Sequence, residues 1–196
     1  MRVPGLLLCG LLPLGLAGTA FGQTPRLAVN VQPHATGKDV NVCVAGPAIP
    51  CTQFDTSGDV FTSYDVYVVA AEGDPTLGIA GASFGVAYPA DLGMFGYSLC
   101  GDLEFPGNGW PASGGGNVIT FAPASNCQTT DYGEGAQAVL CSFYMYAYGA
   151  ADFDVTPRLY ISSTDLAIAN CTSAQTTLPP SAAGSAAFRP LGLTSG

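Results

Sequence analysis

The chain has 196 residues, of which 5 are basic and 14 are acidic, giving a formal net charge of −9 at pH 7. Binding to nucleic acid depends on clustered Lys and Arg that neutralise phosphates, so this composition excludes nucleic acid as a partner and argues against anionic membrane surfaces. Abundant Gly and Pro, few charges and no apolar repeat of helical period beyond residue 22 indicate an all-β domain with many short strands.

The first 22 residues have the order of a secretory signal peptide, with Arg2, an apolar run over Leu6–Leu16 and small residues ending at Gly22. The run is too short to serve as a permanent membrane span. We therefore expect a mature chain secreted to the extracellular space or the periplasm, without membrane attachment after cleavage. Residues 23–171 are expected to form one β-sandwich domain, and the Ala-, Ser-, Thr-, Gly- and Pro-rich residues 172–196 a flexible tail.

Strand signals recur along the mature chain at the spacing of a sandwich. Alternating apolar and polar residues predict strands at Arg26–Gln32 and Asp39–Ala45, and a continuous apolar run predicts a strand covered on both faces at Tyr64–Ala71. The other candidates, in chain order, are Leu77–Tyr88, Phe95–Phe105, Asn117–Ala122, residues 137–148, Arg158–Ser162 and Asp165–Cys171. Together they predict an antiparallel, jelly-roll or immunoglobulin-like β-sandwich of about nine strands.

The strand at Phe95–Phe105 is expected to be amphipathic. Its apolar face takes Phe95, Tyr97, Leu99, Leu103 and Phe105, because these aromatic and aliphatic residues recur along the run.

Six cysteines remain after the signal, because Cys9 leaves with it. An even number of cysteines in an exported chain predicts a disulfide-stapled domain, and six cysteines allow 15 pairings. Proximity in the sequence favours three bridges, Cys43–Cys51, Cys100–Cys127 and Cys141–Cys171. Metal binding is the alternative, but the chain has no C-x-x-C pair and His34 is its one histidine.

The sequence contains only weak signals of catalytic residues. Gly81–Gly85 has Ser83 in a G-x-S-x-G pattern, but the nucleophile elbow needs a strand-to-helix turn and this run is typical of a strand. Asp102 and Glu104 lie two residues apart on one strand face and could form a glycosidase-like pair, although a solvated polar face explains them equally. We therefore predict that the protein is not an enzyme, with a small hydrolase as the weakest alternative.

Asp55 and Asp59 frame a short acidic turn that resembles a calcium-binding loop. Closely spaced carboxylates can converge on Ca²⁺, but Asp and Gly are also the residues that turns select. A calcium site and an ordinary turn both stay open, and no other cofactor is indicated.

Three tyrosines alternate with apolar residues near the end of the strand at 137–148. Tyr144, Tyr146 and Tyr148 are expected on one face, where they could form a flat ribbon for stacking sugar rings, extended by Trp110 in a glycine-rich loop. The competing interpretation is that these rings pack against cross-strand neighbours in the core.

The strand pattern and order over residues 26 to 148 resemble the cohesin and carbohydrate-binding-module type of β-sandwich. The matching segments are Tyr64–Ala70, Gly78–Tyr88, Asn117–Phe121 and Ala138–Phe143, whereas the six cysteines depart from that type. The resemblance implies a nine-stranded, jelly-roll-like sandwich with a non-catalytic binding or assembly role.

We therefore predict a secreted binding or adhesion module whose partner is a polysaccharide or a cell-surface component. The alternative is a structural subunit of an extracellular filament or matrix, in which a terminal segment such as Arg26–Gln32 adds a strand to a neighbour.

Overall fold

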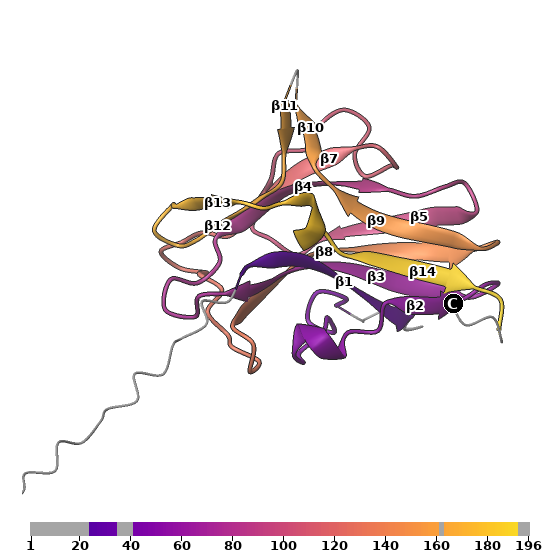
Figure 1. Cartoon of the computed structure of the whole chain (residues 1–196), viewed down its shortest axis with the longest axis horizontal. Helices are drawn as coiled ribbons and strands as arrows, with labels where there is room; N and C mark the ends of the chain where they lie inside the picture. The colour runs from indigo at the N-terminus through magenta and orange to yellow at the C-terminus, as the bar shows by residue number, and fades with distance from the viewer. Residues whose placement is uncertain (1–23, 35–40, 161–162, 192–196) are drawn as a thin grey trace, which may run out of the picture.

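The computed structural model describes residues 24–34, 41–160 and 163–191, so the expected signal peptide lies outside the described residues. Its long elements are all strands, in two main sheets and a hairpin (Figure 1). The first sheet has four strands in the order β1 (Arg26–Pro33), β3 (Ser63–Gly73), β8 (Ala136–Ala147) and β5 (Leu92–Leu99). No helix of the described chain is long and apolar enough to cross a membrane.

The second sheet has eight strands. Its main path runs β13 (Gln175–Thr177), β12 (Ala167–Ala169), β4 (Gly81–Ala87), β9 (Ala151–Thr156), β14 (Ser185–Arg189) and β2 (Ser57–Asp59). Beside that path, β7 (Gly116–Thr120) pairs with β4, and β6 (Leu103–Glu104) pairs with β7. A hairpin of β10 (Arg158–Tyr160) and β11 (Ser163–Asp165) stands above this sheet, and two 3₁₀ turns lie at Cys51–Gln53 and Pro180–Ala182 (Figure 1).

The core lies between the two main sheets, which confirms the all-β sandwich. Alternation along β8 turns Phe143, Met145 and Ala147 inward with no exposed surface, and Phe84 and Phe153 of the second sheet meet them there. The expected strands at Arg26–Gln32, Tyr64–Ala71, Asn117–Ala122 and 137–148 correspond to β1, β3, β7 and β8. The described chain has fourteen strand segments, several of only two or three residues, instead of about nine.

Two strand predictions are wrong in part. The described part of Asp39–Ala45, residues 41–45, forms turns and bends, because Asn41 accepts hydrogen bonds from the backbone of Cys43 and Val44. The segment Phe95–Phe105 is not one strand, since β5 ends at Leu99 in the first sheet and β6 begins at Leu103 in the second.

The expected apolar face of Phe95–Phe105 is also wrong. A β-bulge between Met94 and Gly96 shifts the alternation by one residue, so that Tyr97 packs on the core while Phe95 is 59% exposed. Leu103, in the other sheet, is 62% exposed, and Phe105, directly after β6, is 56% exposed.

The expected flexible tail is instead part of the fold over its described residues. Strand β14 pairs antiparallel with β9 and parallel with β2, and its Phe188 is completely buried. The sequence around β14 gave no strand signal because it consists mostly of small residues. The strand is held in place by one buried aromatic ring and by its two strand partners.

The disulfides differ from the pairing that sequence proximity favoured. Bonds join Cys43 to Cys100 and Cys127 to Cys171, while Cys51 and Cys141 are free. Cysteines that follow one another in the sequence lie on different parts of the two sheets, and so they do not pair. A bulge in β8 turns both Leu140 and Cys141 into the core, so Cys141 is fully buried and cannot reach Cys171 at the end of β12.

Part of the outer face of the first sheet is covered by the segment that follows β1. The Cys43–Cys100 bond fastens this segment beside the end of β5, and Gln137 of β8 donates to the carbonyl oxygen of Ile49 at 3.0 Å. The covering segment ends with the 3₁₀ turn at Cys51–Gln53, which lies against the outer side of β1 and β3 (Figure 1). The opposite end of this face, at the end of β8, carries the exposed aromatic residues.

Candidate functional site

The candidate binding surface is a group of five rings on the outer side of the first sheet, which we name the aromatic face. It consists of His34, Phe95, Tyr144, Tyr146 and Tyr148. Tyr144 and Tyr146 are half-buried and Tyr148 is 51% exposed, since they alternate with the buried residues of β8. The three tyrosines therefore share one face, as the sequence indicated, and that face is accessible.

The rings of the aromatic face touch but do not form a flat platform. Phe95 lies 6.0 Å from Tyr144 at an interplanar angle of 50° and 6.4 Å from Tyr148 at 55°. Tyr146 and Tyr148 lie 4.7 Å apart at 54°. The expected flat ribbon is thus wrong, because the strand twists and Phe95 stands between its neighbours. The surface is therefore corrugated, with neighbouring rings tilted by 50–55°.

His34 closes one side of this surface. Its ring stacks on Tyr144 with centroids 4.0 Å apart and an interplanar angle of 24°, and Nδ1 lies 3.0 Å from Oδ1 of Asp65. Asp65 is only 3% exposed and pairs in register with Tyr144. Sequence reasoning missed this role for His34, because its two partners are distant in the chain. Asp65 follows His34 by 31 residues and Tyr144 follows it by 110 residues.

Trp110 does not belong to this surface. Its indole packs edge-on against Phe84, Tyr97 and Phe143 at 5.5–5.6 Å, on the inner side of the first sheet. The prediction that Trp110 extends the tyrosine platform is wrong, because the loop around it folds over the end of the core. Its partners are core rings, and its role is packing.

Asp102 and Glu104 are held in separate hydrogen-bond networks. Asp102 accepts from the backbone N–H of Ala122 and the side-chain amide of Asn126, at 2.7 Å and 3.0 Å. Glu104 accepts from the hydroxyl of Tyr97 at 2.6 Å and from the amide of Asn117 at 2.7 Å. Burial, with a smaller contribution from Glu104, raises the pKa of Tyr97 well above its usual value. Both carboxylates thus stabilise loops and strand ends.

The expected calcium loop is an Asx turn. Oδ1 of Asp55 accepts from the backbone N–H and the hydroxyl of Ser57 at 2.9 Å and 2.8 Å, and the backbone N–H of Asp59 donates to the hydroxyl of Tyr64. Neither carboxylate belongs to a group of three converging ligand atoms among the described residues. Calcium binding at Asp55 and Asp59 stays a prediction.

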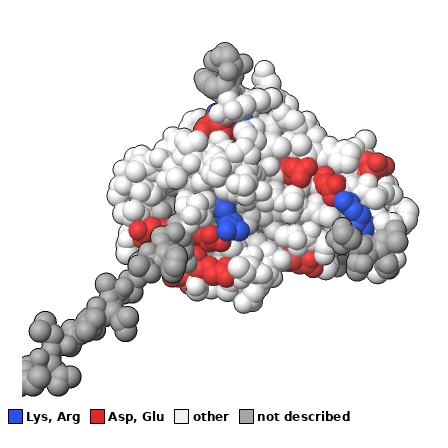
Figure 2. Space-filling view, viewed as in Figure 1, with Lys and Arg blue, Asp and Glu red and all other residues white. Residues whose placement is uncertain are grey.

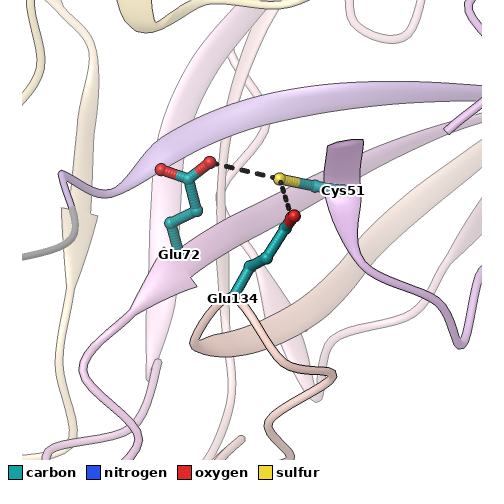
Figure 3. A group of neighbouring side chains, drawn as sticks. All are labelled: Cys51, Glu72 and Glu134. Atoms are coloured by element: carbon teal, nitrogen blue, oxygen red, sulfur yellow. Dashed lines mark hydrogen bonds between the residues drawn. The ribbon is translucent and has the colours of Figure 1, made fainter. Parts of the chain in front are cut away.

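One other group brings candidate metal ligands together, namely Cys51, Glu72 and Glu134 (Figure 3). Sγ of Cys51 lies 3.3 Å from Oε1 of Glu72 and 3.4 Å from Oε2 of Glu134. Thr52 fixes Glu134 through its backbone N–H at 3.1 Å and its hydroxyl, and Arg26 pairs with Glu72 at 2.9 Å. Thiolate and carboxylate are ligand types that zinc accepts.

The electrostatics of this group keep the thiol protonated. Burial, and then the hydrogen bonds and charges of the two carboxylates, raise the pKa of Cys51 to about 12. Hydrogen bonds from Thr52 lower the pKa of Glu134. As it stands, the cysteine is a hydrogen-bond donor that joins the covering segment to β3 and to the loop before β8.

Comparisons with known proteins identify the fold. No protein-family model matches the sequence, and no curated protein matches it. The chain is similar to a chain of the Coh-OlpA–Doc918 cohesin–dockerin complex of Clostridium thermocellum, with 10% identity over 84% of this chain and 99% of that chain and a TM-score of 0.50.

Two further cohesins show weaker similarity. The sixth cohesin of scaffoldin B from Acetivibrio cellulolyticus, solved with a Cel5 dockerin, shares 14% identity over 85% of this chain and 98% of that chain, at a TM-score of 0.48. A cohesin module of a Clostridium perfringens family 33 glycoside hydrolase shares 7% identity over 85% and 99%, also at 0.48. The Clostridium thermocellum match, at a TM-score of 0.50 and 10% identity, shows the fold alone, and the sheets described above agree with it: the chain has a cohesin-like β-sandwich fold.

Proposed function

We propose that this protein is a secreted, non-catalytic module that binds a protein partner through the aromatic face. The observation that supports this most directly is the cluster of accessible, mutually tilted rings of Phe95, Tyr144, Tyr146 and Tyr148 on a sheet whose outer face is partly covered. Tyrosine and other aromatic residues are enriched at protein interfaces, where they contribute much of the binding free energy. The similar structure from Clostridium thermocellum is itself named as a cohesin–dockerin complex.

The structure offers less support for the alternatives. The residues of a hydrolase pair, Asp102 and Glu104, are engaged in separate structural hydrogen bonds. In a filament subunit that donates Arg26–Gln32, this segment would be available to a neighbour, but β1 pairs with β3 of its own chain along its whole length. The other edge of β1 also receives contacts, since Val31 donates to Asp55 and Leu27 accepts from Gly184. The two disulfides suit an oxidising, extracytosolic compartment.

Surface charge bears on the kind of partner. On the face in Figure 2, the blue basic atoms lie beside red acidic atoms and do not form a basic patch. Two of the described cations are in ion pairs, Arg26 with Glu72 and Arg189 with Asp152. A partner with a neutral or basic surface is therefore favoured over an acidic one.

The test uses a matched pair of double variants. Phe95→Ala with Tyr148→Ala removes the most exposed rings of the aromatic face, and Leu103→Ala with Phe105→Ala removes equally exposed apolar side chains from the other sheet. Immobilised mature proteins are exposed to the exported fraction of the source cells, and captured proteins are quantified by mass spectrometry. A captured partner is then purified and titrated against all three proteins.

We expect the aromatic-face variant to bind that partner at least tenfold more weakly and the control variant to bind unchanged, because interface energy concentrates in central aromatic residues. Equal binding by both variants would exclude the aromatic face as the interface. Depletion of the protein by insoluble cellulose, chitin or xylan, abolished by the aromatic-face variant, would instead establish the carbohydrate function.

A further inference from the structure

The second sheet carries a pocket that the proposed function does not use. It lies on the outer face of β4, β7 and β12, at the foot of the β10–β11 hairpin, and has a volume of about 160 Å³. Small residues form its floor, among them Gly81, Ala167 and Ala169, and its polar lining includes Ser83 and Asp165. Figure 1 shows the hairpin rising above these strands. The aromatic face is on the opposite sheet, so the two surfaces are independent.

Ser83 gives the pocket an unsatisfied polar group. Its neighbours Ala82 and Phe84 point into the core, so the alternation of β4 directs Ser83 to the outer face, where it lines the pocket. The residue is only 5% exposed, and its hydroxyl oxygen has no hydrogen-bond partner. Buried polar groups are normally paired, and an exception in a pocket wall indicates that a partner from outside completes the site.

Asp165 gives the pocket a negative charge. The residue is half-buried on β11, directly opposite Arg158 of β10 in the register of the hairpin. The Arg158 side chain lies along β7 on this same face, with its stem over Gly116, where an added Cβ would come within 2.6 Å of Cγ. Its guanidinium donates to the carbonyl oxygen of Phe105 at 3.5 Å. The pocket thus contains a carboxylate beside acceptor hydroxyls and no cationic side chain in its lining.

We propose that this pocket binds the primary ammonium group of a lysine side chain presented by a partner polypeptide. An ammonium group has three donors and no acceptor, and the lining offers the carboxylate of Asp165 together with the oxygens of Ser83 and Thr120. The methyl groups of Ala167 and Ala169 suit the methylene stem of lysine, which packs on apolar surface while its charged head is solvated or paired.

The floor and the size of the pocket fit the same ligand. A volume of about 160 Å³ is far above the roughly 10–15 Å³ that one water molecule needs, so the pocket has room for an ammonium group with its alkyl stem. At Gly81 an added Cβ would lie 2.4 Å from the carbonyl oxygen of Ile119, so the close pairing of β4 with β7 at the pocket requires glycine here. The charge of Asp165 disfavours an anion.

The experiment titrates the folded mature protein with N-α-acetyl-lysine methylamide and with its norleucine counterpart, which lacks the ammonium group. Binding is followed by amide chemical shifts in NMR spectra. We expect the lysine probe to shift signals of β4 and β12 with millimolar affinity that weakens as salt is added. The norleucine probe should bind at least tenfold more weakly.

Two variants and one control distinguish binding in this pocket from non-specific electrostatic attraction of the lysine probe to an acidic protein. Asp165→Asn should weaken the lysine probe at least tenfold, and Ser83→Ala severalfold. Asp154→Asn removes an exposed carboxylate from β9 of the same sheet and should change nothing. Thermal unfolding of each variant checks the fold. The proposal is overturned if the two probes bind equally, if neither shifts β4 and β12, or if Asp154→Asn weakens binding as much as Asp165→Asn.

Discussion

The Cys43–Cys100 disulfide should contribute more to stability than the Cys43–Cys51 bridge that sequence proximity favoured. It closes a separation of 57 residues, whereas the pairing favoured by sequence proximity, Cys43–Cys51, would close only eight. In the chain-entropy treatment a loop of 57 residues stabilises the fold by about 4 kcal/mol, against about 2.5 kcal/mol for eight residues. We therefore expect the double variant Cys43→Ser, Cys100→Ser to lose about 4 kcal/mol of unfolding free energy.

The assay is urea unfolding followed by intrinsic fluorescence, with peptide mapping of the unreduced protein. With a slope of about 2 kcal/mol per molar urea, the midpoint should fall by roughly 2 M. Cys51→Ser is the control, because Cys51 forms no disulfide and its loss should cost less than about 1 kcal/mol. A peptide that links Cys43 to Cys51, or a Cys51→Ser variant as unstable as the double variant, would refute the reasoning.

Four further predictions concern three side chains. With its pKa near 12, Cys51 should carry a thiolate fraction of only about 10⁻⁴ at pH 8, so iodoacetamide should alkylate it far more slowly in the native than in the unfolded protein, and equal rates would contradict this. The Cys51 thiol keeps its proton to a higher pH in the folded state than in the unfolded state. The unfolding free energy should therefore decline as the pH rises from about 9 towards 12, as urea unfolding at several pH values would show. Phe188→Ala should cost about 3–5 kcal/mol in urea unfolding, since the ring is fully buried in β14, and a change below 1 kcal/mol would mean that the tail is not docked. Glu104→Ala should cost about 1–3 kcal/mol because it leaves the hydroxyl of Tyr97 and the amide of the buried Asn117 without their acceptor, and an unchanged unfolding midpoint would exclude that network.

The strands with long, regular alternation were predictable from sequence. β1 and β8 show two-residue alternation and β3 shows a continuous apolar run, and each of these patterns predicts a strand. β14 was not predictable, because its pairing with β9 and β2 depends on segments more than thirty residues away. The register of β5 was not predictable either, since its bulge reverses which side chains face the core.

The candidate sites divide in the same way. The common face of Tyr144, Tyr146 and Tyr148 follows from the two-residue period of a strand, and the sequence indicated it correctly. The ring of His34 on Tyr144 joins distant parts of the chain, and the core position of Trp110 depends on how its loop closes. Neither is encoded in local spacing.

The sequence by itself determined the all-β class, the identity of the longest strands and the alternation that places three tyrosines together, because these depend on the pleat of a single strand. The tertiary structure alone decided which cysteines bond, which segment covers the first sheet, and whether the aromatic residues face solvent or the core. These depend on contacts between residues far apart in the chain, such as Cys43 with Cys100 and Phe95 with Tyr148, and only the pairing of β5 with β8 and the folding of the covering segment onto this sheet bring such residues together.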